Sequence, residues 1–327
     1  MGKIGYGRED QERGEAVILS QAEKKGGQSR LSLKRKILIL MIWILQTMAE
    51  ILKKEQLSDS VWRFRLHAPR VARKRKAGQF VILRPTGDSE RIPLTIANAD
   101  AESGWIEIIF QAVGETTMRL RDLGAGESLR DLAGPLGKPT HIENFGRALC
   151  VGGGVGAAPL YPIINALFKA GNDVTSVIGA RSKGLVILEN DIKASSSRLL
   201  VATDDGSYGT KGFVSDVFKS LVDAGEKFDA AFVIGPAVMM KATCGLTVAA
   251  GIRTYASLNP IMIDGTGMCG GCRVTVGGKT KFACVDGPEF DASQIEWNEV
   301  IARLGRYRDF EARARDRYHV CMMGAAQ

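Results

Sequence analysis

The sequence lacks several features that would place it in a membrane, secreted or repeat class. An apolar run at residues 37–45 has only nine residues, whereas a helix needs about 20 to span a bilayer. No small-residue cleavage site follows this run, so a secretory signal is not supported. No internal repeat of solenoid period is present. With 327 residues, we expect a globular chain of two or three domains, located in the cytoplasm.

The basic balance of the chain is not that of a nucleic-acid-binding protein. The formal net charge is +8, but residues 1–47 hold nine Lys/Arg and five Asp/Glu and so contribute half of it. No aromatic-rich basic motif accompanies the remaining charge. We interpret the charge as ordinary surface charge plus a tail. Six cysteines, three of them clustered, suit a metal site in a reducing compartment better than a disulfide scaffold.

Residues 1–47 differ from the rest of the chain. Residues 1–30 are polar and glycine-rich, which predicts disorder, and a basic stretch then precedes the short apolar run. Three interpretations remain open. The reading frame begins upstream of a true start at Met48, the segment lies at a membrane interface, or it docks on the protein as a helix.

Two regions with different sequence patterns follow from residue 48 onward. Up to about residue 136 the pattern is β: Trp62, Phe64 and Leu66 alternate with polar neighbours, as in a half-buried strand. Short strands that are closely spaced predict a small antiparallel barrel. The basic run at 70–76 is expected to be a solvated loop. From residue 148, buried strands alternate with amphipathic helices, which predicts a parallel sheet with crossover helices.

The expected fold class is an antiparallel β-barrel domain plus an α/β parallel-sheet domain, with a C-terminal cysteine-rich loop. A polar, Arg-rich helix is expected at about residues 295–318. The expected organisation is 1–47 for the extension, 48–143 for the barrel, 144–258 for the α/β domain, and 259–327 for the cysteine loop with the C-terminal helix.

The cysteine-rich stretch at 264–284 carries the most specific chemical signal. Cys269, Cys272 and Cys284 are spaced C-x2-C-x11-C, and Asp264 stands five residues ahead of the first. Six of the fourteen residues at 265–278 are glycine, so the backbone can wrap an anionic cluster with its N–H groups. Cysteine thiolates are the usual ligands of iron–sulfur clusters. A structural zinc site, buried thiols, or a disulfide between Cys269 and Cys272 remain alternatives.

Two glycine turns in the α/β region predict a nucleotide site. The first joins a strand to a helix, whose N-terminus attracts phosphate, although it lacks the G-x-G-x-x-G spacing. The second leads into another helix at the same sheet edge, where open α/β sheets bind ligands. The residues concerned are Gly152, Gly153, Gly154, Gly156 and Pro159 in the first turn, Gly235, Pro236 and Met239 in the second, and Arg181 and Asp204 after the intervening strands.

A third pattern lies in the barrel region. Arg91, Pro93 and Thr95 share one face of an expected strand, where a cation and backbone donors can hold a flavin phosphate and ring edge. The glycine at 114 opens a short helix whose N-terminus attracts anions. An ordinary edge strand and an N-capped helix are the alternatives.

Taken in order, these motifs resemble the ferredoxin–NADP reductase superfamily. The resemblance rests on the Arg-x-Pro-Leu-Thr strand, the Gly-x-x-Thr helix start, the two glycine turns and the cysteine loop. Within the superfamily, the chain is similar to the dihydroorotate dehydrogenase electron-transfer subunit branch. In that branch it is similar to small (alpha) subunits of NADH-dependent reduced ferredoxin:NADP oxidoreductases, a group that includes sulfide dehydrogenase subunits. The resemblance covers about residues 48–323.

The resemblance implies FAD in the barrel, NAD(H) or NADP(H) on the α/β domain, and a 2Fe–2S cluster in the cysteine loop. It assigns the flavin to Arg91, Pro93, Leu94 and Thr95 with Gly114, Thr116 and Thr117, the nucleotide to the two glycine turns, and the cluster to Asp264, Cys269, Cys272 and Cys284. Many flavin reductases have Tyr in the place of Pro93, and the orotate-linked relatives have Cys in the place of Asp264. Asp in that place matches the ferredoxin:NADP branch.

The function implied is that of an electron-transfer subunit without catalytic acid–base residues. Electrons would pass between NAD(P)H, FAD and the cluster, within an electron-bifurcating ferredoxin:NADP(H) transhydrogenase. The implied partner is a larger flavin and iron–sulfur subunit similar to the glutamate synthase small subunit, with ferredoxin involved indirectly. Two alternatives remain, a dihydroorotate dehydrogenase electron-transfer subunit and a zinc-stabilised nucleotide-binding module without redox activity. Cys150, Cys244 and Cys321 are expected to be structural.

Overall fold

The computed structural model describes residues 49–324 of the chain. The predictions for residues 1–47 therefore lie outside the described residues. Within the described part, no helix combines the length and the apolar character needed to cross a membrane. The described residues group as one unit.

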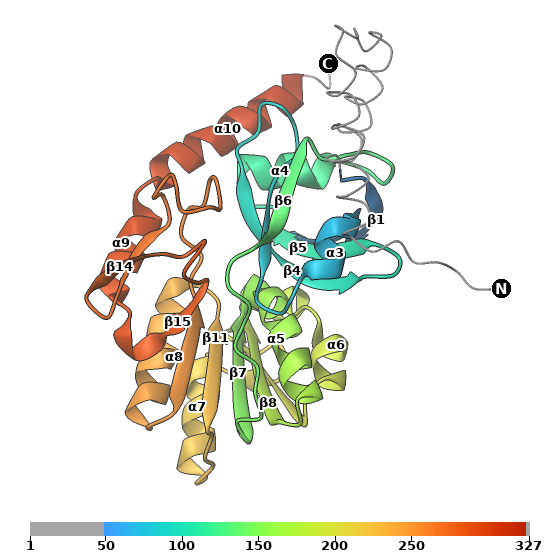
Figure 1. The fold of residues 1–327 in the computed structure, drawn as a ribbon. Helices are drawn as coiled ribbons and strands as arrows, with labels where there is room; N and C mark the ends of the chain where they lie inside the picture. Colours follow the sequence, from blue (N-terminus) through green and yellow to red (C-terminus); the bar gives the residue numbers. More distant parts are fainter. Residues whose placement is uncertain (1–48, 325–327) are drawn as a thin grey trace, which may run out of the picture. The chain divides into compact units, whose positions relative to one another are not determined.

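Six antiparallel strands form the first half of this unit, in the order β1-β2-β5-β4-β3-β6 (Figure 1). An antiparallel bridge between Glu50 and Ser128 joins the segments that lead into the two outer strands, so the sheet closes on itself as a barrel. The predicted barrel is confirmed. The strands are Ile51–Gln56 (β1), Val61–His67 (β2), Phe80–Arg84 (β3), Ile92–Asp100 (β4), Trp105–Gln111 (β5) and Asp131–Leu136 (β6).

Alternate side chains of β2 point into the core of the barrel. Phe64 and Leu66 are fully buried, and the ring of Phe64 meets Phe110 of β5 edge to face, with ring centroids 5.1 Å apart. Because alternate residues point to opposite faces, Arg63 and Arg65 lie on the outer face of the strand. That face meets helices of the second half of the unit.

The basic run at 70–76 is not simply a solvated loop, as was expected. Residues Pro69–Lys74 form helix α3, which buries Val71 and Ala72 against the barrel core. Two apolar residues within the run provide the buried face, and proline at the first helical position favours a helix start. The charges of Arg73 and Lys74 remain exposed.

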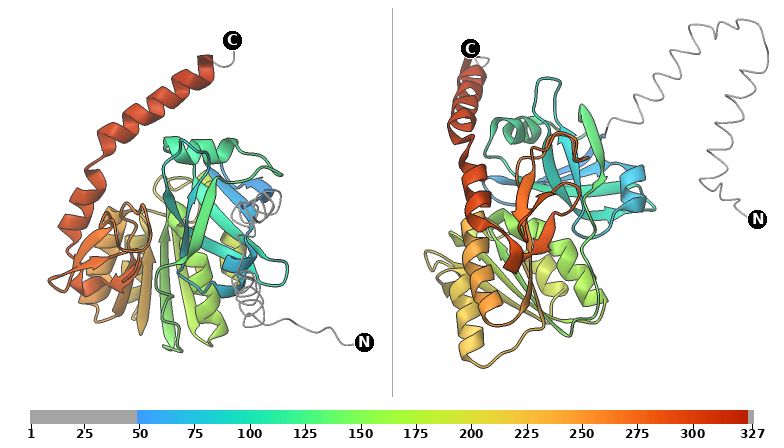
Figure 2. Two further views of the ribbon diagram at one scale, coloured as in Figure 1. Left: turned by 45° about the horizontal axis from the view of Figure 1, so that its top comes forward. Right: turned by 60° about the vertical axis from the view of Figure 1, so that its left-hand side comes forward.

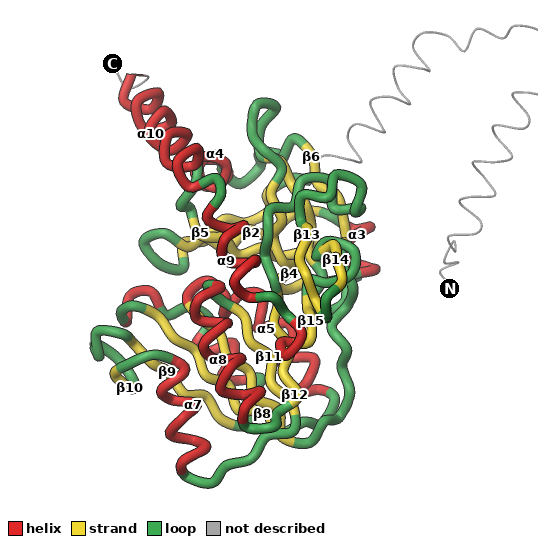
Figure 3. The backbone as a smooth tube through the Cα atoms, turned by 90° about the vertical axis from the view of Figure 1, so that its left-hand side faces the viewer, coloured by secondary structure: helices red, strands yellow, loops and turns green. Residues whose placement is uncertain are grey.

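Seven strands form the second sheet, in the order β10-β9-β8-β7-β11-β12-β15. All neighbours are parallel except the pair β12–β15. The predicted parallel α/β sheet is confirmed, and Figure 3 shows its strands in yellow together with the helices α7 and α8 in red. Its strands are Arg147–Gly153 (β7), Asp173–Ala180 (β8), Arg198–Thr203 (β9), Thr210–Lys211 (β10), Ala230–Ile234 (β11), Arg253–Ser257 (β12) and Glu289–Asp291 (β15).

Helices cover both faces of this sheet. Helices α5 (Ala157–Lys169) and α6 (Glu189–Ala194) share one apolar core with the sheet and with the barrel residues Val61 and Ile109. Helices α7 (Val214–Asp223) and α8 (Ala237–Ala249) share the other with residues of the cysteine loop. The α/β sheet is therefore packed against the barrel on one side and the cysteine loop on the other.

The C-terminal segment holds the hairpin β13 (Arg273–Val276) and β14 (Lys279–Phe282). The single helix expected at 295–318 is wrong, because two helices are present: α9 (Trp297–Gly305) and α10 (Arg308–Gly324). Gly305, a poor helix former, is the last residue of α9. Helix α10 runs back to α4 (Glu115–Asp122) of the barrel (Figure 2), where the guanidinium of Arg119 lies 5.9 Å from the ring centroid of Tyr318.

Three chain segments meet around the carboxyl group of Glu289. The hydroxyl of Thr140, in the link between the sheets, donates to Glu289 Oε1 at 2.8 Å. Gly78, which precedes β3, packs directly on both residues, and a Cβ there would lie 2.7 Å from Glu289 Oε1. Burial raises the pKa of the Glu289 carboxyl to about 7, because a charged carboxylate is poorly solvated there.

This carboxyl group predicts a specific pH dependence of stability. The pKa of Glu289 is higher in the folded protein than its ordinary value of 4.5, so between these values the native state binds more protons than the unfolded state. The free energy of unfolding therefore falls as pH rises from about 4.5 to about 7, by the order of 1–3 kcal/mol. Glu289→Gln should remove this component. Urea unfolding of both proteins at pH 5 and pH 8 measures it, and equal pH dependence in the two would contradict the assignment.

Candidate functional site

The two glycine turns lie at the point where the order of the parallel strands reverses. The chain enters the sheet at β7, adds β8 and β9 on one side, and returns to add β11 and β12 on the other. Ligands of open α/β sheets bind at such a switch point, outside the carboxyl ends of the strands. The turn after β7 and the turn after β11 flank this point, as the sequence predicted.

The glycines of these turns allow the two turns to touch. A Cβ on Gly156, the residue before α5, would lie 2.5 Å from the carbonyl oxygen of Ile234. A Cβ on Gly153 would lie 2.2 Å from the sulfur of Met239 in α8. Met239 thus packs against the first turn. These two glycines are needed for the close packing of the turns, so they do not by themselves indicate a ligand.

Gly154 is different, because it faces open space. Its φ is +57°, which favours glycine, and a Cβ there would have no atom within 4 Å. It lies in the 3₁₀ turn that leads into α5, so free backbone N–H groups of a helix start are next to an open surface. A pyrophosphate fits this arrangement in charge and in space.

Arg181 and Asp204 follow β8 and β9 on the same edge. Asp204 N donates to the carbonyl of Ala180 at 3.0 Å, and Asp205 N donates to the carbonyl of Arg181 at 3.2 Å. The two loops are therefore tied together by their backbones, while both predicted side chains are exposed. They lie on the β9 side of the switch point, where a ribose or its phosphate would extend.

The predicted flavin strand is β4. Pro93 and Leu94 pair with Ile82 and Val81 of β3. Leu94 packs against the barrel core, so alternation places Pro93 and Thr95 on the outer face. Arg91 directly precedes the strand.

Gly114 is the N-cap of α4, and Thr117 organises that turn. The hydroxyl of Thr117 accepts from Gly114 N at 3.0 Å and from Val113 N at 3.1 Å. It also donates to the carbonyl of Gly114 at 2.9 Å. Its side chain is thus occupied with the helix start, while Thr116 is buried. The first N–H groups of the helix remain the anion-attracting part of the turn.

Arg91 joins the flavin strand to the cysteine loop. Its Nε donates to the carbonyl of Ile263 at 2.9 Å, and its Nη1 contacts Asp131 at 2.8 Å. Asp131 also pairs with Arg84 of β3 at 2.8 Å. The carbonyl that Arg91 holds belongs to the residue just before Asp264. The start of the loop is therefore fixed to the strand that is predicted to carry the flavin.

The four predicted cluster residues lie as two pairs. The sulfurs of Cys272 and Cys284 are 3.2 Å apart, and both residues are buried. Asp264 binds the loop backbone through Oδ2, which accepts from Cys269 N at 2.7 Å. Cys269 itself is exposed. One pair is therefore buried and the other lies at the surface.

The protonation of these groups follows from their surroundings. Hydrogen bonds from the backbone N–H groups of Thr266 and Cys269 hold the pKa of Asp264 below its usual range. Burial, and then the hydrogen bond with Cys272, raise the pKa of the Cys284 thiol to about 12. Metal binding must displace that proton. Burial likewise raises the pKa of the Cys150 and Cys244 thiols, which suits their predicted structural role; the side chain of Cys321 is outside the described residues.

The arrangement fits a binuclear cluster better than a single metal ion. The spacing Asp264-x4-Cys269-x2-Cys272, followed by Cys284, matches the plant-type 2Fe–2S spacing with Asp in the first place. Two irons need two ligands each, and the chain offers two pairs. Backbone N–H groups of Gly271 and Cys284 also donate to Cys269 and Cys272 sulfurs, each at 3.4 Å.

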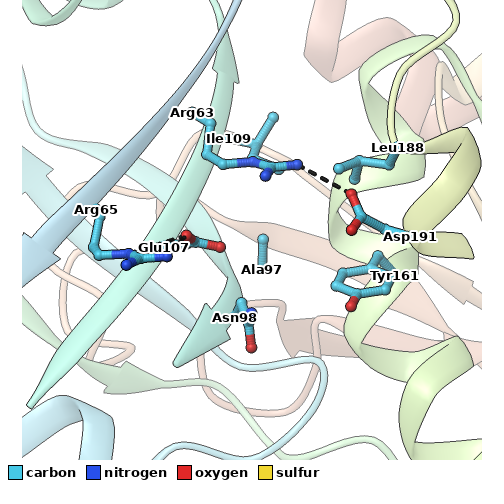
Figure 4. A pocket seen from close by; sticks show the side chains of 9 residues that line it. All are labelled: Arg63, Arg65, Ala97, Asn98, Glu107, Ile109, Tyr161, Leu188 and Asp191. Carbon is cyan, nitrogen blue, oxygen red and sulfur yellow. Dashed lines mark hydrogen bonds and ion pairs between the residues drawn. The ribbon is translucent and has the colours of Figure 1, made fainter. Parts of the chain in front are cut away.

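A polar cavity of about 150 Å³ lies between the outer face of the barrel and helices α5 and α6 (Figure 4). Arg63 reaches Asp191 of α6 at 3.2 Å, and Arg65 reaches Glu107 of β5 at 2.8 Å. Small-molecule sites are usually 300–1,000 Å³, so this cavity is too small for a dinucleotide. It contains none of the predicted cofactor residues. The Arg63–Asp191 ion pair joins the barrel to α6, whereas the Arg65–Glu107 pair lies within the barrel.

Sequence reasoning missed the residues that hold the cysteine loop from outside. Asp131 anchors Arg91, and Arg303 of α9 donates from Nη2 to the carbonyl of Gly271 at 3.2 Å. Neither lies in a motif, and both contacts join residues more than 30 positions apart. Only the high arginine content of the C-terminal segment hinted at such a role.

Comparison with known proteins agrees with this geometry. A family model for the iron–sulfur cluster binding domain of dihydroorotate dehydrogenase B matches residues 259–296. A dihydroorotate dehydrogenase B (NAD(+)) electron transfer subunit homolog from Thermotoga maritima is 46% identical over 269 residues, which are 82% of this chain and 95% of the relative. The electron transfer subunit of Fusobacterium nucleatum is 33% identical and covers 74% of this chain and 95% of its own length.

Solved structures show the same fold. A chain from the structure of an NADH-dependent reduced ferredoxin–NADP oxidoreductase, a study of flavin-based electron bifurcation, superposes with a TM-score of 0.79 at 45% identity. The match covers 83% of this chain and 98% of that chain. The ferredoxin reductase of carbazole 1,9a-dioxygenase, at 21% identity and a TM-score of 0.54, covers 63% of this chain and 66% of its own and shares the fold.

These similarities confirm the predicted fold class and, at the level of the family, an electron-transfer oxidoreductase subunit that uses FAD, a nicotinamide nucleotide and an iron–sulfur cluster. The individual site residues stay predictions. The chain belongs to the family of dihydroorotate dehydrogenase B electron-transfer subunits and their homologues.

Proposed function

We propose that the protein is the small subunit of an NADH-dependent ferredoxin–NADP(H) oxidoreductase that carries out electron bifurcation. When bound, FAD would accept the hydride of the nicotinamide and a 2Fe–2S cluster would take electrons one at a time. The chain's own contribution is to bind these groups, orient them and keep them close. No side chain of the site is needed as an acid or a base.

One observation carries the proposal most strongly: the hydrogen bond from Arg91 to the carbonyl of Ile263. It links the flavin strand to the residue before the first cluster ligand. Close packing supports it, because Gly265 has a φ of +79° and a Cβ there would lie 2.6 Å from Leu136 and 2.9 Å from Ile82. The loop is thus seated on strands β3 and β6, beside the flavin strand.

The remaining residues are assigned by their place in the fold. Pro93 and Thr95, on the outer face of β4, would lie against the flavin ring, and the start of α4 at Gly114 would face its pyrophosphate. Gly154 and the start of α5 would hold the pyrophosphate of the nicotinamide nucleotide. Arg181, exposed beyond β8, would lie near the ribose.

Asp264 favours the ferredoxin-linked function over the orotate-linked one. The resemblance puts cysteine in this place in orotate-linked subunits and aspartate in the ferredoxin:NADP group. Sequence identity alone does not separate the two functions, because the solved ferredoxin–NADP oxidoreductase chain is 45% identical and the Thermotoga homolog named after the orotate-linked subunit is 46% identical.

A larger partner subunit would dock on the cysteine loop. Met268, at the tip of the loop, is 89% exposed, and Ile261, Ile263 and Val285 are exposed beside it. We call these four residues the apolar rim. Ile261, Ile263 and the thiol of Cys269 all lie next to Gly271, and Val285 lies next to Gly267. The exposure of Cys269 would place one end of the cluster site at the surface. We propose that the occupant is a larger flavin and iron–sulfur subunit similar to the glutamate synthase small subunit, since short distance across a dry contact favours electron transfer.

We also propose a cytoplasmic location. The three thiols of the loop must stay reduced in order to bind iron. A reducing compartment maintains that state.

The first test is an anaerobic titration of the purified protein with NADH and then with NADPH. We expect a visible spectrum with flavin bands and a broad iron–sulfur shoulder, both of which lose intensity on addition of the preferred nucleotide. A colourless protein that holds zinc, and that FAD and iron cannot reconstitute, would overturn the redox function in favour of a zinc-stabilised module.

The ligand assignment is tested by a matched pair of cysteine variants. Cys284→Ala removes a buried ligand and should abolish the acid-labile sulfide and most of the bound iron. Cys244→Ala, at an equally buried position in α8, should leave both unchanged. Iron and sulfide analysis of the two proteins, each checked by circular dichroism, makes the comparison. Full iron content in the Cys284 variant would refute the assignment.

The docking surface is tested by placing a charge on the apolar rim. Met268→Glu should weaken association with the co-expressed larger subunit at least tenfold, because an unpaired carboxylate would be buried at the contact. Phe213→Glu changes an exposed apolar residue at the start of α7 and serves as the control. Size-exclusion chromatography measures the complex. Equal association of both variants would exclude the rim as the docking surface.

A further inference from the structure

Two arginines bind consecutive peptide groups of the loop between Cys269 and Cys272. Arg273 Nη1 donates to the carbonyl of Gly270 at 2.8 Å. Arg303 of α9 donates from Nη2 to the carbonyl of Gly271 at 3.2 Å. These are two of the three peptide groups that lie between the exposed sulfur of Cys269 and the buried sulfur of Cys272.

The contact of Arg273 continues to a cluster sulfur. The carbonyl of Gly270 belongs to the same peptide group as the N–H of Gly271, and this N–H donates to Cys269 Sγ at 3.4 Å. A cation on the carbonyl polarises the peptide and strengthens its N–H as a donor, because hydrogen bonds in a chain reinforce one another. The charge of Arg273 therefore strengthens the hydrogen bond from the Gly271 N–H to the sulfur of Cys269.

The charges of both arginines are uncompensated by their contacts. Within residues 49–324, neither Arg273 nor Arg303 forms an ion pair with a carboxylate, and each binds a neutral carbonyl instead. Arg91, by contrast, is paired with Asp131. Arg303 is half-buried, whereas Arg273 is exposed. Two fixed positive charges without a partner next to a loop of anionic ligands point to an anionic group in that loop.

We propose that Arg273 and Arg303 are positioning residues that also raise the reduction potential of the iron–sulfur cluster. This inference rests on the proposed function. Three thiolates and a carboxylate give the oxidised cluster a net negative charge, and reduction adds one more. Nearby cations stabilise the more negative state, and charge and hydrogen bonds to sulfur are known determinants of such potentials. The arginines thus favour electron flow toward the cluster.

The experiment is a mediator titration of the cluster in the purified holoprotein, followed by electron paramagnetic resonance. Arg303→Gln retains a hydrogen-bond donor and removes the charge, so the midpoint potential should fall. At the wild-type midpoint, the ratio of reduced to oxidised cluster should fall about threefold, which corresponds to about 30 mV for a one-electron couple. Arg273→Gln should act in the same direction but less, because its exposed charge is screened by salt.

Two further variants separate charge from structure. Arg306→Gln removes a charge one turn further along the chain, at the end of α9, where the exposed side chain makes no hydrogen bond to the loop among the described residues, and should leave the potential unchanged. Arg303→Lys keeps the charge and should retain most of the wild-type potential. If Arg303→Gln loses iron while Arg303→Lys retains it, the cation is needed to hold the loop, and Arg273→Gln then tests the potential.

Two different results would overturn the inference and the proposed function separately. Equal midpoint potentials in wild type, Arg303→Gln, Arg273→Gln and Arg306→Gln, at full iron content, would overturn the inference. A wild-type protein without iron and acid-labile sulfide would instead overturn the proposed function, because that result does not depend on the arginines.

Discussion

The hydrogen bond from Arg91 to the carbonyl of Ile263 is the contact on which the rest of the arrangement depends. Asp131 holds the guanidinium in place from β6. The packing of Gly265 on Leu136 and Ile82 adds to this link, and Phe80 and Ile82 share one apolar core with Cys272 and Cys284. Electron transfer is sensitive to distance, so a fixed link between the two predicted cofactor sites matters more here than a reactive side chain.

The second constraint is the reversal of strand order at β7. It leaves the turns after β7 and β11 side by side, and glycines let them approach closely. On one side of the sheet, α5 and α6 pack against the barrel, where Arg63 and Asp191 form an ion pair. On the other side, the core includes Cys272 and Cys284. The predicted nucleotide edge thus belongs to a sheet that packs against the barrel on one face and the cysteine loop on the other.

The sequence was sufficient for the fold class and for placing the two glycine turns at one edge of the sheet. The alternation of Phe64 and Leu66 predicted a barrel strand, and the glycine turns predicted a nucleotide edge, because these patterns reflect local geometry. Local reasoning was wrong where packing decided the outcome. The apolar residues at 71 and 72 turn a basic run into helix α3, and a glycine at 305 ends a helix that charge patterning had continued to Tyr318.

The sequence by itself determined which chemistry is available: three thiols and a carboxylate in a glycine-rich loop, and glycine turns that suit phosphate. Only the tertiary structure decided how they are connected. It brought Arg91 to a carbonyl 172 residues away and Arg303 to Gly271. It also set Cys272 against Cys284. The physical reason is that ligand type and backbone freedom are properties of single residues and short spacings, whereas a guanidinium finds its acceptor only when distant elements have packed.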